Sequence, residues 1–138
     1  MSPQIHIGRK IGKIRGYVRE LGKFRGVTSA ELSADLQKRA ALERFLYLAC
    51  DSMISLMEMI IVEKKYERAE NYSENIDVLL ERQDIIPEQA EILHKIVGLR
   101  NALSHDYENL NLQILSDIVQ HKLSEFNALL DFFEKTYV

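Results

Sequence analysis

The stretch LERFLYLACDSMISLMEMII, residues 42–61, decides the fold of this chain. Its apolar side chains recur every three or four positions, which is the period of one face of an α-helix. This stripe consists of Leu42, Phe45, Leu46, Ala49, Met53, Leu56, Ile60 and Ile61. No glycine or proline interrupts residues 34–66, so the pattern predicts one long helix across that range. A helix of about 30 residues extends about 45 Å, which suits the spine of a helical bundle.

A helix is also predicted on the N-terminal side of this spine, over residues 4–25, where apolar residues again recur at helical spacing. Gly26 would end it. Gly8, Gly12 and Gly16 lie four residues apart and share one side of this helix. Each glycine lowers helix propensity by up to about 1 kcal/mol relative to alanine, so we expect another helix to approach closely there.

Three shorter segments follow the spine. The sequence predicts a helix capped by Ser73 that runs to about Arg82, and a second helix over residues 88–104 that begins after Pro87. Asn111 is a plausible cap for the last helix, which has a strongly apolar face. No alternating pattern predicts a sheet. We therefore expect an all-α protein, an up-and-down bundle of four to five helices.

Composition places this bundle in a broad class. A length of 138 residues predicts one domain over residues 1–138, and Cys50 is the single cysteine, so no disulfide can form within the chain. The apolar run at 53–62 contains Glu58 and is too short to span a bilayer. The N-terminus lacks the apolar core of a secretory signal. These features predict a cytoplasmic protein without a membrane partner.

The net charge of −3 conceals an asymmetry. Residues 1–26 carry a net charge of +6, which leaves −9 for residues 27–138. The basic members are Arg9, Lys10, Lys13, Arg15, Arg19, Lys23 and Arg25. Such a segment could contact nucleic acid phosphates. The alternative, which we favour, is a solvated helix face or a basic helix docked on acidic residues of the same fold.

Polar side chains gather in GLRNALSHDYENL, residues 98–110. On a continuing helix, Asn101 and His105 share one face, and Arg100 and Ser104 share the adjacent face. Arg100 and His105 are five residues apart, which separates them by about 140° around the helix axis. They can meet at one ligand only if the helix frays or turns near Ser104, or if two copies of the chain combine their residues across a dimer interface.

The chemistry of these side chains suits a phosphodiester. Histidine transfers protons near neutral pH, and arginine holds a phosphate with a forked, permanently charged donor set. No metal-binding motif accompanies them, and cleavage of RNA by attack of its own 2′-hydroxyl needs neither a metal nor a cofactor. The structural alternative is a helix end, with Arg100 paired to an acid and His105 favoured by the helix dipole.

The segment RNALSHDY resembles the Arg-x4-His-x-Tyr motif of the HepT-like family in the HEPN (higher eukaryotes and prokaryotes nucleotide-binding) superfamily. Here the motif consists of Arg100, four residues, His105, Asp106 and Tyr107. The resemblance extends over roughly residues 36–135. It includes the segments LERFLYLACDSM, NYSENIDVLLE, DIIPEQAEILHKI and VGLRNALSHDYENLNLQIL. The basic N-terminal helix fits the family only loosely.

This resemblance implies a helical bundle that forms a homodimer through the motif-bearing helices, with two motifs side by side in a cleft. It implies a toxin that acts as a metal-independent endoribonuclease on tRNA or mRNA. Arg100 and His105 would be the catalytic pair, and Asn101 would orient the phosphate or His105. The partner would be an MntA-like nucleotidyltransferase antitoxin that transfers AMP to Tyr107. The family also allows a non-catalytic module that binds a nucleotide or docks this partner.

Two more residues are candidates for supporting roles. Asp51 interrupts the apolar stripe of the predicted spine, and a buried carboxylate needs a partner. It could hold His105 or a basic residue of the partner subunit. The alternative is an Asp that lies at the solvent edge or is bonded within the bundle. Ser104 could assist within the motif. Cys50 fits a small core residue better than a nucleophile.

Overall fold

The structure is a computed structural model that describes residues 2–105 and 110–138. In these ranges the secondary structure is helical, which confirms the prediction of an all-α bundle. The α-helices are α1 (Pro3–Gly22), α2 (Ser29–Ala34), α3 (Leu36–Glu63), α4 (Tyr72–Glu81), α5 (Pro87–His105), α6 (Leu112–Asp117) and α7 (Leu123–Tyr137), and the π-helical turn η2 (Ile118–Lys122) joins the last two.

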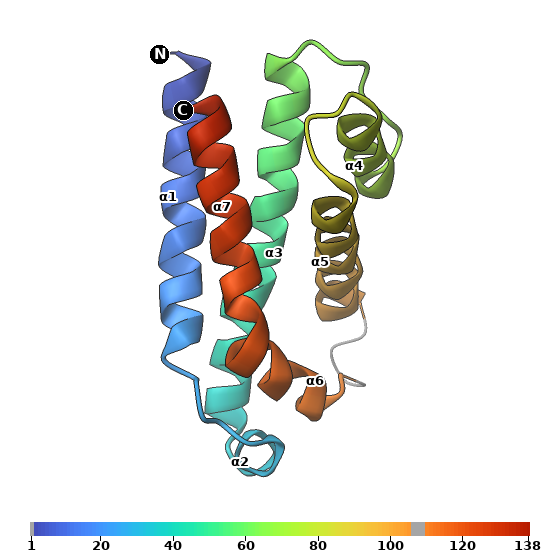
Figure 1. The fold of residues 1–138 in the computed structure, drawn as a ribbon. Coiled ribbons are helices and arrows are strands. Elements are labelled where there is room, and N and C mark those ends of the chain that lie inside the picture. The colour runs from blue at the N-terminus through green and yellow to red at the C-terminus, as the bar shows by residue number, and fades with distance from the viewer. Residues whose placement is uncertain (1, 106–109) are drawn as a thin grey trace.

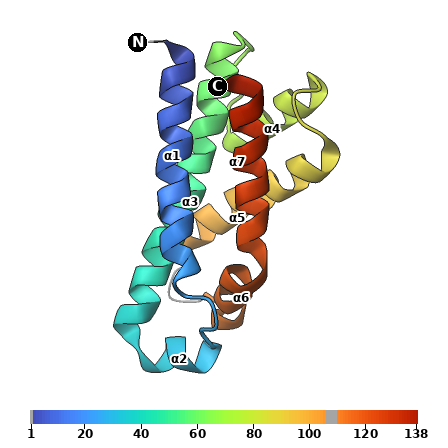
Figure 2. The ribbon, with the colours of Figure 1, turned by 60° about the vertical axis from the view of Figure 1, so that its left-hand side comes forward.

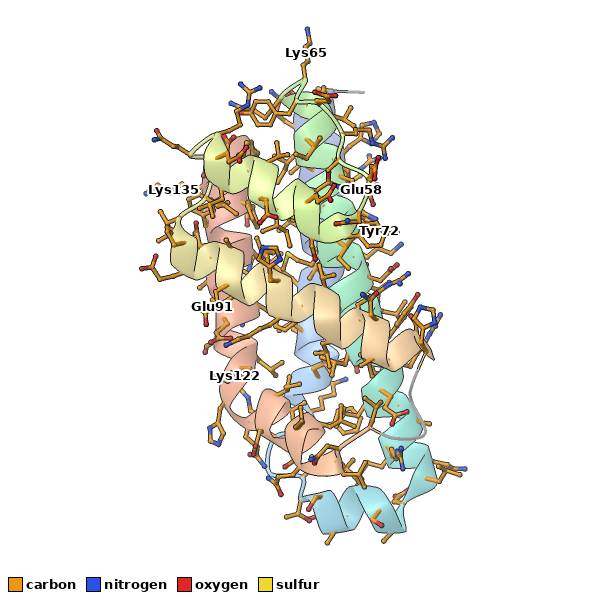
Figure 3. All side chains as sticks on the ribbon, turned by 90° about the vertical axis from the view of Figure 1, so that its right-hand side faces the viewer. Glu58, Lys65, Tyr72, Glu91, Lys122 and Lys135 are labelled. Atoms are coloured by element: carbon orange, nitrogen blue, oxygen red, sulfur yellow. The ribbon has the colours of Figure 1, made fainter. Side chains whose placement is uncertain are left out.

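The long helices α1, α3 and α7 lie side by side along one direction (Figures 1 and 2). The helices α4 and α5 cross the face of α3 obliquely, as Figure 3 shows from the side. The last turns of α5 thereby reach the N-terminal half of α3. This oblique crossing, and not a parallel bundle, determines which residues of α3 meet the polar motif.

The spine helix α3 is buried on more than one side. Its fully buried side chains include Leu42, Leu46, Ala49, Cys50, Met53, Leu56, Ile60 and Ile61. By length and hydropathy alone α3 could cross a membrane, but 56% of its most apolar window is buried inside the fold. Contacts with α1, α4 and α5 account for the apolar composition of this helix.

Several predicted boundaries shift because a different residue caps the helix. Helix α1 ends at Gly22, and Gly26 instead adopts a positive φ of 88° in the connection to α2. Asp35 accepts a hydrogen bond from the Lys38 amide at 3.1 Å and starts α3. Asn71, not Ser73, caps α4 by accepting from the Glu74 amide at 2.9 Å.

The predicted capping by Asn111 is confirmed, since its side chain accepts from the Gln113 amide at 2.9 Å. The last helix is not continuous, however, because the turn η2 interrupts it. Gln120 in this turn accepts from the Gly26 amide at 3.0 Å and donates to the Val27 carbonyl at 2.9 Å. This residue therefore ties the connection after α1 to the C-terminal helices.

The expected close helix approach at the glycines of α1 is wrong. A Cβ atom at Gly12 would meet nothing within 4 Å, and one at Gly16 would meet only Arg19 of the same helix. At Gly8 the nearest atoms belong to Val138, at 3.5 Å. The glycines lie away from the buried face of α1, which consists of isoleucine, valine and leucine side chains.

One residue of the basic N-terminal segment docks on acidic residues of the same fold. Arg15 lies 2.8 Å from Asp131 and 2.7 Å from Glu134 on α7, and these hydrogen bonds raise its pKa. Arg19, Lys23 and other basic side chains of the segment are exposed. The favoured interpretation, a basic helix that docks on acidic residues of the same fold or is solvated, is thus confirmed at Arg15.

Candidate functional site

Arg100 lies in the last turns of α5, and Asp51 in the middle of α3 holds it. The Arg100 Nε atom donates to the Asp51 Oδ1 atom at 3.2 Å. Burial alone would lower the pKa of Arg100, but this hydrogen bond and the nearby charges raise it. The guanidinium therefore stays charged although its side chain is only 20% exposed.

Two tyrosine rings complete the surroundings of Arg100. Its guanidinium carbon lies 5.7 Å from the ring centroid of Tyr47 on α3 and 5.7 Å from that of Tyr72 at the start of α4. Both distances fall in the range of cation–π contacts. Arg44 approaches the Tyr47 ring as well, at 5.6 Å. Residues of two other helices, α3 and α4, thus fix the position of one guanidinium group of α5.

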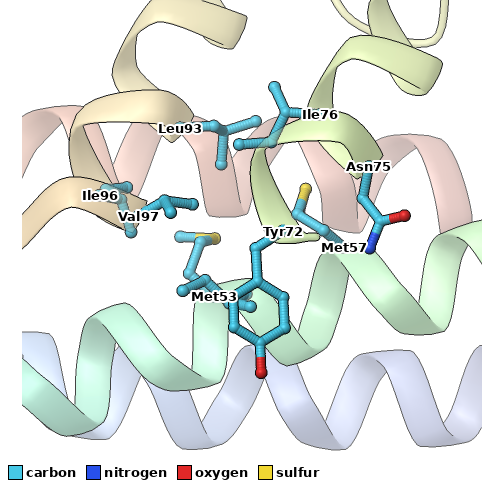
Figure 4. A pocket seen from close by; sticks show the side chains of 9 residues that line it. Met53, Met57, Tyr72, Asn75, Ile76, Leu93, Ile96 and Val97 are labelled. Carbon is cyan, nitrogen blue, oxygen red and sulfur yellow. The ribbon is translucent and has the colours of Figure 1, made fainter. Parts of the chain in front are cut away.

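Tyr72 also borders a small internal cavity between α3, α4 and α5, which Figure 4 shows from close by. Met53, Met57 and Leu93 are among its apolar lining residues. The volume of about 10 Å³ is that of one water molecule at most. Asn75 at its edge is occupied, because its side chain accepts from the Ala69 amide at 3.1 Å. This cavity is part of the packed core and holds no ligand-sized space.

The remaining motif residues lie near the end of α5. The Asn101 side chain accepts from the Arg100 Nη1 atom at 3.3 Å, and Ser104 Oγ donates to the Arg100 carbonyl at 3.2 Å. His105 is the last residue of α5 and is exposed. Tyr107 lies outside the described residues.

The structure brings some of the predicted site residues together and separates others. Arg100, Asn101, Ser104 and Asp51 form one connected group. His105 remains on the same continuous helix as Arg100, so the two diverge by about 140° as the spacing predicts. Asp51 binds Arg100 of its own chain, so the alternative of a contact within the bundle is the one observed.

An open hollow lies beside this group, between the N-terminal half of α3 and the end of α5. Its volume is about 410 Å³. The lining residues are Ala40, Glu43, Arg44, Tyr47, Leu103 and Ser104. The sequence prediction missed Arg44 and Tyr47. The available signal was the spacing of Arg44, Tyr47 and Asp51, which places three polar or aromatic side chains on one face of an apolar helix.

Other reactive side chains lie apart from the site. Cys50 is fully buried, and this burial raises the pKa of its thiol, which disfavours the reactive thiolate. His94 Nε2 lies 2.9 Å from Asp77 Oδ1, within hydrogen-bond distance, at the protein surface. Within residues 2–105 and 110–138, no three histidine, cysteine or acidic side chains are grouped so that they could hold a metal ion.

Comparison with known proteins gives a family match over most of the chain. The family model described as "Ribonuclease HepT-like" matches residues 14–133. The mRNA nuclease HepT of Shewanella oneidensis strain MR-1 is 25% identical over 122 residues, which cover 88% of this chain and 91% of that protein.

Two solved structures have the same fold. One is described as tri-AMPylated Shewanella oneidensis HEPN toxin in complex with MNT antitoxin. It is 24% identical with a TM-score of 0.85, and the match covers 98% of this chain and 99% of that one. The second is a toxin–antitoxin with AMP-PNP, 24% identical with a TM-score of 0.83, and covers 94% and 97% of the two chains. At this identity the likeness shows the HEPN helical fold.

Proposed function

Because this chain belongs to the ribonuclease HepT-like family, we propose that it is the toxin of a HepT/MntA-type toxin–antitoxin pair and cleaves RNA without a metal ion. The observation that carries the proposal is the position of Arg100. Asp51, Tyr47 and Tyr72 hold a permanently charged, phosphate-binding group one turn before the exposed His105.

The proposed reaction is an attack of a ribose 2′-hydroxyl on the adjacent phosphate. His105 accepts the 2′-hydroxyl proton, the 2′-oxygen bonds to phosphorus, and the bond to the 5′-oxygen breaks. The leaving 5′-oxygen takes up a proton from water, and a 2′,3′-cyclic phosphate remains on the other fragment. Arg100 stabilises the extra negative charge of the phosphorane, and Asn101 orients the phosphate or His105.

We propose a homodimer as the active form, formed through the motif-bearing helices. On one chain Arg100 and His105 diverge, so a single copy does not direct both side chains to one phosphate. A twofold axis near the end of α5 would place His105 of one copy opposite Arg100 of the other. Each single domain, residues 1–138, would then contribute half of each site.

Regulation by a nucleotidyltransferase is the next part of the proposal. The relative described as a tri-AMPylated HEPN toxin is bound to an MNT antitoxin. By similarity, an MntA-like partner would transfer AMP to Tyr107, two residues after His105. The added phosphodiester brings bulk and negative charge to the site, which would exclude an anionic RNA.

Cleavage in the presence of a chelator tests the nuclease. The wild-type chain should cleave RNA in EDTA, and His105→Ala should abolish cleavage while helical content and dimer state stay unchanged. His94→Ala is the matched control, because His94 is also partly exposed and lies on the same helix but outside the motif. Equal cleavage by His105→Ala and the wild type would remove His105 from the mechanism.

A second candidate is a non-catalytic module that docks a nucleotidyltransferase, because both solved relatives are described as toxin–antitoxin assemblies. It predicts tight partner binding without RNA cleavage. Co-expression with an MntA-like nucleotidyltransferase, followed by intact-mass measurement and peptide mapping, tests the regulatory site. Adenylate on a residue other than Tyr107, or none at all, would refute the role of Tyr107 without refuting the nuclease.

A further inference from the structure

Arg44 is an exposed cation that stands over an aromatic ring. Its guanidinium carbon lies 5.6 Å from the centroid of Tyr47. The adjacent acid, Glu43, is already engaged, since it accepts from Arg39 Nε at 2.9 Å. Within the described part of the chain, Arg44 has no ion pair of its own. Its permanent charge is therefore available to an anion from outside.

Two positive groups gather at the same tyrosine. Arg100 approaches the Tyr47 ring at 5.7 Å, nearly the distance of Arg44. Asp51 neutralises only the charge of Arg100, by its contact at 3.2 Å. The mutual repulsion of the two arginines is relieved best when an anion binds beside them.

The open hollow next to this ring has the size and lining of a nucleotide site. Its volume of about 410 Å³ falls within the range of small-ligand sites. Ala40, Leu103 and the Tyr47 ring supply apolar surface for a base, and Arg44 lies at the same wall for a phosphate. Ser104 contributes a hydroxyl oxygen that can accept a hydrogen bond.

We propose that this hollow binds one unpaired nucleotide of the RNA substrate, next to the phosphate that is cleaved. The base stacks on Tyr47, and a backbone phosphate contacts Arg44. This inference rests on the proposed nuclease function, because Ser104 in the hollow immediately precedes His105. A base within an A-form duplex has both faces covered by its neighbours, so the site selects single-stranded RNA.

Binding of an RNA that cannot be cleaved tests the inference. A single-stranded 12-mer of 2′-O-methyl RNA lacks the attacking hydroxyl, so its affinity is measured on the wild-type chain without turnover. Tyr47→Leu should weaken binding roughly 5- to 150-fold, the effect of losing one base–aromatic stack. Tyr47→Phe retains the ring and should bind within about twofold of the wild type.

Arg44→Gln provides an independent arm, because Arg44 is exposed and its replacement leaves the core intact. It should weaken binding and lower the slope of log affinity against log salt by about 0.7, the contribution of one single-strand phosphate. Arg82→Gln is the matched control. The guanidinium carbon of Arg82 also lies over a tyrosine ring, 4.8 Å from the centroid of Tyr66. Arg82 comes shortly before the first residue of α5, Pro87, whereas the hollow lies at the last turn of α5. It should leave both affinity and slope unchanged.

The outcomes separate this site from the nuclease itself. If the wild type cleaves RNA but Tyr47→Leu and Arg44→Gln bind it normally, the nucleotide site is refuted and the nuclease stands. Equal affinity of the wild type for duplex and single-stranded RNA would also refute the nucleotide site. So would a Tyr47→Leu variant that loses affinity for free AMP but keeps its affinity for RNA. A wild type that neither binds nor cleaves RNA would refute both proposals.

Discussion

Arg100 depends on side chains that are distant in the sequence. Asp51 and Tyr47 come from α3, and Tyr72 comes from the first turn of α4. The sequence indicates that Tyr47 and Asp51 share a helix face, because they are four residues apart. It does not indicate that this face meets Arg100, since that contact depends on the oblique crossing of α5 over α3. The motif residues were therefore predictable, whereas their immediate partners were not.

Replacing Asp51 distinguishes its effect on the orientation of Arg100 from its effect on the stability of the fold. The Asp51 side chain is 41% exposed, so Asp51→Ala should lower the free energy of unfolding by less than about 1 kcal/mol. The same change should lower the rate constant of RNA cleavage at least tenfold, because Arg100 loses the acceptor that fixes its orientation. Urea unfolding and single-turnover cleavage measure the two effects.

Asp51→Asn serves as the conservative control, since an amide oxygen can still accept from the Arg100 Nε atom. Asp51→Asn should cleave RNA faster than Asp51→Ala but more slowly than the wild type, and its KM should stay close to that of the wild type. A loss of stability in Asp51→Ala with an unchanged cleavage rate would show that the contact is only structural.

At the scale of helices, periodicity located the elements well and their ends less well. The apolar stripe of α3 predicted a helix over residues 34–66, and the observed helix is Leu36–Glu63. Asp35 caps the start of α3 and Asn71 caps the start of α4. Near each of these positions the sequence offers more than one residue that could cap the helix, so the boundary was harder to predict. The π-helical turn η2 carries no comparable local signal. Gln120 in this turn accepts a hydrogen bond from the Gly26 amide, in the connection between α1 and α2. This contact joins residues far apart in the sequence, so local sequence patterns do not predict it.

The open surroundings of Gly12 make it a site for stabilisation. A Cβ atom there meets nothing within 4 Å, and the residue is exposed within α1. Gly12→Ala should therefore raise the free energy of unfolding by about 0.5–1 kcal/mol, through reduced backbone entropy of the unfolded chain. Gly26→Ala is the contrasting variant, because its φ of 88° disfavours any side chain. It should lower stability by about 1 kcal/mol or more. Denaturant titrations that show the same sign for both variants would contradict this explanation.

At the scale of the whole molecule, the raised pKa values of Tyr137 and Cys50 limit stability at alkaline pH. Burial and the neighbouring Asp84 raise the pKa of Tyr137 above its ordinary value of 10.0, and burial raises the pKa of Cys50 above 9.0. The folded state thus keeps these protons when the unfolded chain has already lost them. Their contribution is complete below about pH 9 and is lost as the pH rises through the raised values.

Thermal unfolding between pH 7 and pH 11 should show this loss. Stability should be constant to about pH 9 and then fall by up to about 1.4 kcal/mol per pH unit for each group. Tyr137→Phe removes one titrating proton and the hydrogen bond to Asp84 at 3.1 Å. It should be about 1 kcal/mol less stable at pH 7 and have a shallower alkaline slope. An unchanged slope in Tyr137→Phe would exclude Tyr137 as a source of the pH dependence.

The divergence of Arg100 and His105 makes the proposed shared site testable by subunit mixing. Arg100→Ala and His105→Ala should each be inactive. In a mixed dimer with sites shared between copies, one site loses both residues, while the other retains Arg100 from one copy and His105 from the other. Random exchange makes half of the dimers mixed, so cleavage should return to about a quarter of the wild-type level. If both residues acted within one chain, every site would lack one of them and mixing would restore nothing. The same samples, separated by size under conditions that permit exchange, establish whether the mixed dimer has formed.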